Sequence, residues 1–299
     1  MNRLNYEKVF KTLVEETGNY LVNHSLRAMV LGVSGGIDST VVAAICCEVN
    51  KQTNIPLIGR SLPIKNKKDE FDVSKLVGEA FCNNFDVANL YDEYKCFLSG
   101  LVWREERIDL LDDTETMHPE KSKQQTLIAN GNIQARLRMI YLYNLASIHN
   151  GLVMSTDNQT EYQLGFWTIH GDVGDFDPIR DLWKTEVYQL AEWLKLFYYT
   201  DGDDADKAVA IGESIKLTPT DGLGISNSDL DQIGAKSYND VDRVLQTLVC
   251  PASPENDRVQ DALTVEIGPE IIDKIIKRRS NSRFKREKSP IYISRERYE

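Results

Sequence analysis

The chain has 299 residues, of which 41% are hydrophobic and 27% charged, and its formal net charge is −11. This balance is typical of a soluble globular protein with a substantial core. No apolar run approaches the ~20 residues that a membrane-spanning helix needs, and the N-terminus lacks the apolar core of a secretory signal. The five cysteines are scattered, at positions 46, 47, 82, 96 and 250, without a C-x-x-C pair. We therefore expect reduced thiols in a cytoplasmic protein, with no disulfide framework and no membrane association.

The negative charge is unevenly distributed. Residues 274–299 carry +7, so residues 1–273 carry −18. A basic run of this kind is either a solvated helix and tail or a cationic wall for a polyanionic ligand. The acidic balance of the whole chain argues against broad binding of duplex nucleic acid, and we expect no nucleic-acid partner.

The apolar pattern predicts helices and strands in alternation. In chain order we expect a helix over 6–21, a strand over 28–33, a helix over 40–49, a strand over 55–62, a helix over 70–81, a strand over 85–90, a helix over 130–149, a strand over 151–156 and a helix over 184–197. Such alternation favours one α/β domain, with a mostly parallel sheet covered by helices on both faces. We expect mobile loops over 109–123 and 200–206, and a loop with short helices over 221–242.

The segment Ser34-Gly35-Gly36-Ile37-Asp38-Ser39 lies between the first predicted strand and a helix. A helix N-terminus offers unpaired N–H groups and partial positive charge, glycines allow an anion to approach the backbone, and the serines add hydroxyl donors. Asp38 would repel a phosphate unless a divalent cation lay between them, which implies Mg²⁺. The spacing is neither G-x-x-x-x-G-K-[ST] nor G-x-G-x-x-G. The alternative is a tight strand–helix junction without a ligand.

This string resembles the PP-loop of ATP pyrophosphatases. Further segments at 132–139, 155–161, 165–168 and 171–172 follow in order, and with them the chain is similar to the ammonia-dependent NAD synthetases from its first helix to about Pro290. The resemblance implies a three-layer α/β/α fold with a mostly parallel sheet, of the adenine nucleotide alpha hydrolase-like (Rossmann-like) type. It also implies a single domain over 1–299 with a basic C-terminal segment over 274–299.

Matched position by position, the resemblance implies an ATP and metal site. Asp38 and Glu161 match the family's magnesium ligands, and Mg²⁺ is the expected metal. Thr156, Lys184 and Thr220 match ATP contacts beside the turn at 34–39. Asp38 and Lys184 are accordingly expected to act in catalysis, since a lysine is a point-charge donor for a phosphate that gains charge in the transition state.

The same resemblance implies a site for deamido-NAD. Arg136 and Asp175 match residues that hold the dinucleotide, and Phe284 and Lys285 match the family's C-terminal substrate contacts, which would explain the basic tail. Asp172 matches an aspartate at the reacting centre, where it could accept a proton as ammonium becomes ammonia.

The implied reaction is a two-step ligation. The carboxylate of deamido-NAD attacks the α-phosphorus of ATP and releases pyrophosphate, and ammonia then converts the acyl-adenylate to NAD and AMP. Free ammonia is the expected nitrogen donor, and a homodimer is the expected assembly. One departure falls at Ile169, where the family carries a lysine. The alternatives are another adenylating PP-loop ligase with a different acceptor, and a non-catalytic nucleotide-binding relative.

Overall fold

The computed structural model describes residues 4–109, 119–200, 204–218, 229–249 and 263–287. At its centre lies a parallel sheet of four strands in the order β3-β2-β1-β4. The strands are β1 (Met29–Gly32), β2 (Leu57–Ser61), β3 (Asn84–Val87) and β4 (Leu152–Val153). Each lies within or overlaps a predicted strand, so the alternation of apolar runs located the sheet.

The strand β1 occupies an interior position of the sheet. Met29 pairs with Leu57 of β2 on one side and with Leu152 of β4 on the other. The β1 segment is apolar and buried, as parallel strands covered on both faces usually are. Its carboxyl end, where Ser34 follows, therefore lies in the middle of the sheet edge at which ligands gather in open α/β folds.

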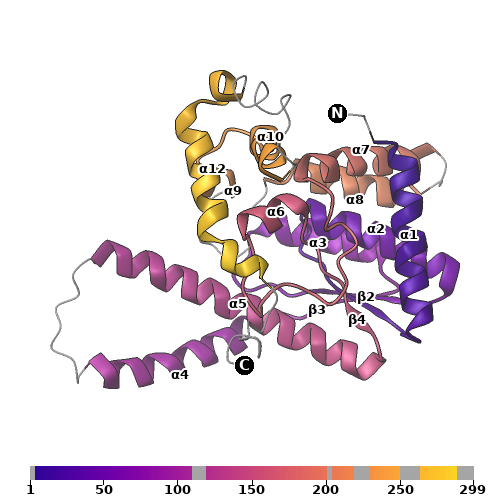
Figure 1. Cartoon of the computed structure of the whole chain (residues 1–299). Helices are drawn as coiled ribbons and strands as arrows, with labels where there is room; N and C mark the ends of the chain where they lie inside the picture. The colour runs from indigo at the N-terminus through magenta and orange to yellow at the C-terminus, as the bar shows by residue number, and fades with distance from the viewer. Residues whose placement is uncertain (1–3, 110–118, 201–203, 219–228, 250–262, 288–299) are drawn as a thin grey trace, which may run out of the picture.

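Helices cover both faces of the sheet (Figure 1). One face packs against α1 (Tyr6–Asn23), α2 (Ile37–Thr53), α3 (Lys68–Phe81), α7 (Lys184–Thr200) and α8 (Ala205–Lys216). The other face packs against α5 (Pro119–His149) and part of α4 (Tyr91–Asp109). The structure thus confirms the predicted three-layer α/β/α arrangement.

The prediction of a mobile loop over 109–123 is wrong at both ends. The helix α4 continues to Asp109 and α5 begins at Pro119, while residues 110–118 lie outside the described part. The two helices project from the body as a pair of arms (Figure 1). Glu, Lys, Arg and Gln favour helix even where no apolar stripe marks it, so polarity alone did not indicate a loop.

Two other predicted loop regions also contain helix. The helix α8 begins at Ala205, inside the segment 200–206, and 201–203 lie outside the described residues. In the segment 221–242, α9 (Asp229–Ile233) and the start of α10 (Tyr238–Val249) agree with the predicted short helices.

A smaller apolar cluster lies beside the main layers. It is formed by α6 (Gln159–Leu164), α9, α10 and α12 (Pro269–Asn281), with η1 (Arg283–Arg286) following α12. Ile272 and Ile275 turn inward, so the basic segment from 274 begins on a helix with one buried side. Among the described helices, none combines the length and apolarity needed to cross a membrane. The single-domain organisation stays a prediction.

Candidate functional site

The turn between β1 and α2 has the backbone conformation that its glycines suggest. Gly35 adopts φ +83°, and a Cβ on it would lie 2.7 Å from the backbone nitrogen of Ser74. Gly36 is the residue at the N-cap of α2. Position 35 therefore accepts no side chain without movement of α3, because both the dihedral angle and the close approach require glycine.

Helix α8 braces this turn from the side. The Ser214 hydroxyl donates to the carbonyl oxygen of Gly35 at 2.8 Å and lies 2.9 Å from the Thr40 hydroxyl. Within the turn, the hydroxyls of Ser34 and Ser39 lie 2.9 Å apart. Sequence reasoning missed Ser214, since no local pattern connects it to a turn 179 residues away.

Asp38, Glu161 and Lys184 come together at one point. Lys184 Nζ lies 2.5 Å from Asp38 Oδ2 and 3.1 Å from Glu161 Oε1, and its side chain is 3% exposed. Burial alone would lower the pKa of Lys184, but the carboxylates of Asp38 and Glu161 outweigh it and raise that pKa well above its ordinary value. The group is therefore a protonated ammonium at neutral pH, beside the turn between β1 and α2.

Local capping positions these side chains. Asn158 forms a capping box with Glu161 at the start of α6. Its side-chain amide also donates to Asp38 Oδ1 at 2.8 Å, which links α6 to α2. The pattern Asn-x-x-Glu could have indicated this cap from sequence, but the bond to Asp38 could not have been foreseen.

Asp242 of α10 fixes the start of α7. Its carboxylate accepts hydrogen bonds from the Thr160 hydroxyl at 2.5 Å and from the Thr185 backbone at 2.9 Å. The Thr160 hydroxyl in turn accepts from the backbone N–H of Lys184 at 2.9 Å. Asp242 thereby holds Lys184 in place indirectly, a role that no motif in the sequence indicates.

The donor set fits a magnesium ion that arrives with phosphate. Asp38 and Glu161 present hard oxygens to a common cation, at present the Lys184 ammonium. Within the described residues, no cluster of three or more His, Cys, Asp or Glu side chains could hold a metal alone. Magnesium commonly takes one or two carboxylates and completes its shell with waters and substrate phosphates. The pair is thus suited to Mg²⁺ bound to a nucleotide rather than to a resident metal.

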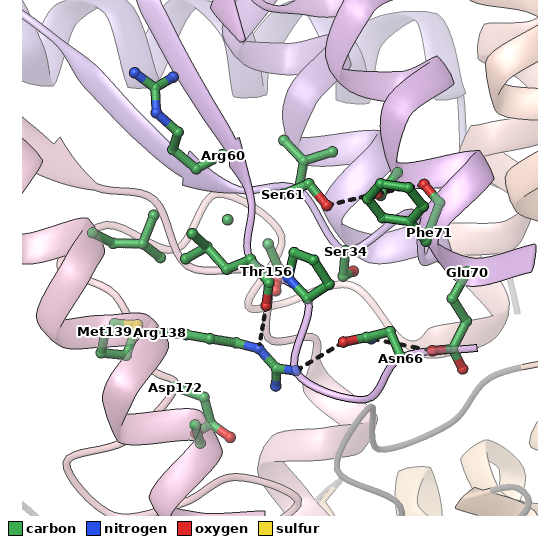
Figure 2. Close-up of a pocket in the computed structure, with 17 residues that line it drawn as sticks. Ser34, Arg60, Ser61, Asn66, Glu70, Phe71, Arg138, Met139, Thr156 and Asp172 are labelled. Carbon is green, nitrogen blue, oxygen red and sulfur yellow. Dashed lines mark hydrogen bonds between the residues drawn. The ribbon is translucent and has the colours of Figure 1, made fainter. Parts of the chain in front are cut away.

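Two adjoining cavities open at the carboxyl ends of the strands. The turn cavity, about 190 Å³, is lined by Ser34 and the residues from Gly36 to Ser39, together with Glu161 and Lys184. The inner cavity, about 260 Å³, extends between β2, α3 and α5 (Figure 2). Ser34 and Thr156 line both. The two cavities therefore adjoin at these shared residues. The predicted ATP contact Thr220 lies outside the described residues.

The wall of the inner cavity carries an organised polar group. Arg138 of α5 donates to the Leu62 carbonyl oxygen at 3.0 Å and to Asn66 Oδ1 at 3.1 Å (Figure 2). Burial lowers the pKa of Arg138 to about 10, so its guanidinium stays charged at neutral pH. Arg138 lies within the segment 132–139, on which the family resemblance partly rests, but the resemblance implied no role for it.

Asp172 lines the inner cavity at the end nearest α5. It accepts a hydrogen bond from the Thr168 backbone N–H at 2.8 Å. Desolvation, with a contribution from the Asp157 charge, raises the pKa of Asp172 to about 7. The side chain has substantial surface open to the cavity, so water there tempers the shift. A carboxyl group with a pKa near neutrality can exchange protons during turnover.

A large cavity of about 840 Å³ adjoins the other side of the segment around Asp172. The predicted substrate contacts Arg136, Phe284 and Lys285 all line it. Arg136 donates to the Ile169 carbonyl oxygen at 3.1 Å, so Ile169 contributes backbone as well as side chain to this wall. Asp175 does not line the large cavity. It accepts instead from the Tyr143 hydroxyl at 2.9 Å and from the Val153 backbone at 3.1 Å.

Comparison with known proteins gives a consistent result. A sequence model described as NAD synthase matches residues 9–289. An NH(3)-dependent NAD(+) synthetase of Pyrococcus furiosus is 28% identical over 96% of this chain and 94% of its own. One of Thermoplasma acidophilum is 35% identical over 72% of this chain and 75% of its own. The solved NMN synthetase of Francisella tularensis has a TM-score of 0.72 and 23% identity over 98% of this chain and 100% of its own, which shows the shared fold.

Proposed function

This chain belongs to the NAD synthase family, and we propose that it uses ATP to join ammonia to the carboxylate of deamido-NAD, giving NAD, AMP and pyrophosphate. The enzyme is a ligase that forms a carbon–nitrogen bond. The observation that carries the ATP-dependent mechanism is the buried Lys184 ammonium, held between Asp38 and Glu161 beside a glycine turn at a helix N-terminus.

In the first step, a carboxylate oxygen attacks the α-phosphorus and the bond to pyrophosphate breaks. The N–H groups of the turn at Gly35 and Gly36 bind the departing phosphates, and Lys184 neutralises charge that develops on them. Asp38 and Glu161 would hold Mg²⁺, which when bound supplies Lewis-acid charge to the pyrophosphate oxygens. The turn cavity thus receives the phosphates, and the inner cavity receives the nucleoside of ATP.

In the second step, ammonia attacks the acyl carbon and AMP leaves with the bonding electrons. Asp172 would accept the proton that ammonium must lose, because a carboxyl group with a pKa of about 7 can exchange protons near neutral pH. The deamido dinucleotide occupies the large cavity beside Arg136 and Lys285. Its carboxylate would then point past Asp172 toward the α-phosphorus.

The test combines product analysis with one substitution. The purified chain is incubated with Mg-ATP, ammonium and deamido-NAD, and AMP and NAD are expected in equal amounts. Asp38→Asn should lower the rate about 10²–10³-fold, as loss of one electrostatic stabiliser does, and should raise the Mg²⁺ concentration needed for half-maximal rate. Asp92→Asn, an exposed first-turn aspartate of α4, is the matched control. AMP formation that does not depend on deamido-NAD would reject the proposal.

A different acceptor is the second candidate. Ile169 stands where the family carries a lysine that contacts the dinucleotide, so this chain lacks that cation. The residues expected to bind ATP and the metal, namely the turn, Lys184, Asp38 and Glu161, are all present. The same assay should therefore include nicotinate mononucleotide, the half of the dinucleotide that carries the reacting carboxylate. A higher kcat/KM with the mononucleotide would assign that substrate instead.

We also propose that the protein is a homodimer located in the cytoplasm. Apolar side chains on α5 are exposed, with Ile140 at 67% and Ile148 at 66%, and a second copy could cover them. Sedimentation of the purified chain should give twice the monomer mass, and a monomer at working concentration would contradict the dimer.

A further inference from the structure

Arg180 lies in the wall of the large cavity with its guanidinium stacked on an aromatic pair. Its Cζ atom is 3.7 Å from the ring centroid of Tyr162 and 5.8 Å from that of Trp167. The two rings are nearly parallel, at 9° with centroids 5.7 Å apart. The rings fix the plane of the guanidinium, and a stacked guanidinium keeps its in-plane N–H groups for another partner. No motif in the sequence indicated this residue.

The other cations of the large cavity are engaged with the protein backbone. Arg136 donates to the Ile169 carbonyl oxygen, Lys285 to the carbonyl oxygens of Gly165 and Trp167, and Arg286 to those of Gln163 and Arg279. These hydrogen bonds hold together the chain segments that form the wall of the large cavity. Arg180 differs, because its one hydrogen bond to the described residues goes to a side chain, from Nη1 to Asp177 Oδ2 at 3.2 Å.

The charge of Arg180 is only partly compensated by that partner. Desolvation, followed by the charge of Asp157, raises the pKa of Asp177 to about 8 despite the neighbouring guanidinium. Asp177 Oδ1 is buried and has no hydrogen-bond partner among the described residues. Near neutral pH the pair therefore retains net positive charge, and the Arg180 side chain is 30% exposed.

Arg180 also lies near Asp157, which is on the chain segment that leads to Asn158 and Glu161. The charges of both Arg180 and Asp38 act on the buried carboxyl group of Asp157, which immediately precedes the Asn158 that binds Asp38. Arg180 and Asp38 therefore both lie near Asp157, while Arg180 itself lines the large cavity. In the proposed reaction, the carboxylate is the part of the acceptor that must approach this point.

We propose that Arg180 binds the reacting carboxylate of the acceptor and so distinguishes the acid substrate from the amide product. This inference rests on the proposed function, and it assigns a role in substrate selection to a residue outside the recognised motifs. A guanidinium matches a carboxylate with two parallel N–H donors, whereas a neutral carboxamide accepts only one such bond and carries no charge. Binding would weaken when the amide forms, which favours release of product.

The experiment compares substrate and product on the same variant. Arg180→Gln should raise the KM for deamido-NAD about 10–100-fold, the usual loss of a charge-assisted hydrogen bond. The Ki of NAD as product inhibitor and the KM for ATP should change less than about 2-fold, within the scatter of near-neutral contacts. Arg180→Lys keeps the charge without the fork and should show an intermediate KM. Arg243→Gln, which removes an exposed pair with Glu266, is the matched control.

Each other outcome rejects the inference. An equal rise in KM for deamido-NAD and Ki for NAD would mean that Arg180 contacts a part common to both, such as a phosphate. Unchanged constants would mean that the pair with Asp177 is structural. If Arg180→Gln fails to fold, the same comparison is made with Arg180→Lys: its KM for deamido-NAD should rise more than its Ki for NAD. If wild-type protein produces no NAD from deamido-NAD, the proposed function fails first, and that result is separate from a failure at Arg180.

Discussion

Lys184 Nζ lies 2.5 Å from Asp38 Oδ2, joining the first turn of α7 to the first turn of α2. Glu161 Oε1 is 3.1 Å from the same nitrogen. A lysine expected to contact ATP and two carboxylates expected to bind a metal therefore share one position. The Lys184 ammonium compensates the charges of Asp38 and Glu161. Under the proposed function, Mg²⁺ that binds with ATP would compensate the two carboxylates instead, and Lys184 would be released toward the phosphates.

Replacing Lys184 tests this exchange. Lys184→Met keeps the length of the side chain and removes its charge, so AMP formation should fall about 10²–10³-fold. Because Asp38 and Glu161 would then repel each other, millimolar Mg²⁺ should raise the melting temperature of the variant more than that of wild type. Lys195→Met, on the exposed side of the same helix, is the control. A melting temperature equally insensitive to Mg²⁺ in both proteins would contradict a shared cation site.

Gly35 offers a test of the turn itself. In Gly35→Ala, the new Cβ would meet the Ser74 nitrogen at 2.7 Å in a backbone conformation with φ +83°. We expect a loss of about 2 kcal/mol or more in the free energy of unfolding, together with weaker ATP binding measured by calorimetry. Gly100→Ala meets nothing within 4 Å on an exposed helix, so it should be neutral or slightly stabilising. Normal ATP affinity in the Gly35 variant would show that the turn does not hold the phosphates.

The raised pKa of Asp172 predicts how the reaction rate depends on pH. Its pKa is raised to about 7, chiefly by desolvation, so it is protonated and unable to accept a proton below that pH. The rate at saturating ammonium should therefore fall as the pH drops through about 7. Asp172→Asn should lose activity by about 10²–10⁴-fold, and the ratio of wild-type to variant rate should rise with pH across this range. A constant ratio from pH 6 to pH 8.5 would exclude Asp172 as the base.

The fold was predictable wherever local sequence determines it. The apolar run at 28–33 followed by the Ser-Gly-Gly turn located β1 and indicated a helix directly after it, although α2 begins at Ile37 and not at the predicted position 40. No helix was predicted where α4 lies, and α5 was predicted only from position 130, although Glu, Lys, Arg and Gln in these segments favour helix.

The site was predictable only in part, because much of its support is tertiary. The bonds of Asn158 to Asp38 and of Thr160 to Asp242 span 120 and 82 residues. The place of Arg180 in the large cavity depends on how the segment after Pro178 packs against α6. Such contacts follow from the packed fold and leave no periodicity or spacing in the sequence.

Ser214 gives the sharpest test of that tertiary support. Its hydroxyl bridges the Gly35 carbonyl oxygen and the Thr40 hydroxyl inside the core. In Ser214→Ala, the Gly35 carbonyl oxygen loses this donor, which should cost about 1–3 kcal/mol of unfolding free energy in urea. The turn would also lose a restraint, so the KM for ATP should rise while the KM for deamido-NAD stays the same. Ser147→Ala removes a comparable but exposed hydroxyl on α5 and should change neither. An equal rise in the KM for ATP and the KM for deamido-NAD would mean that Ser214 stabilises the fold in general. An effect through the turn at Gly35 should weaken the binding of ATP alone.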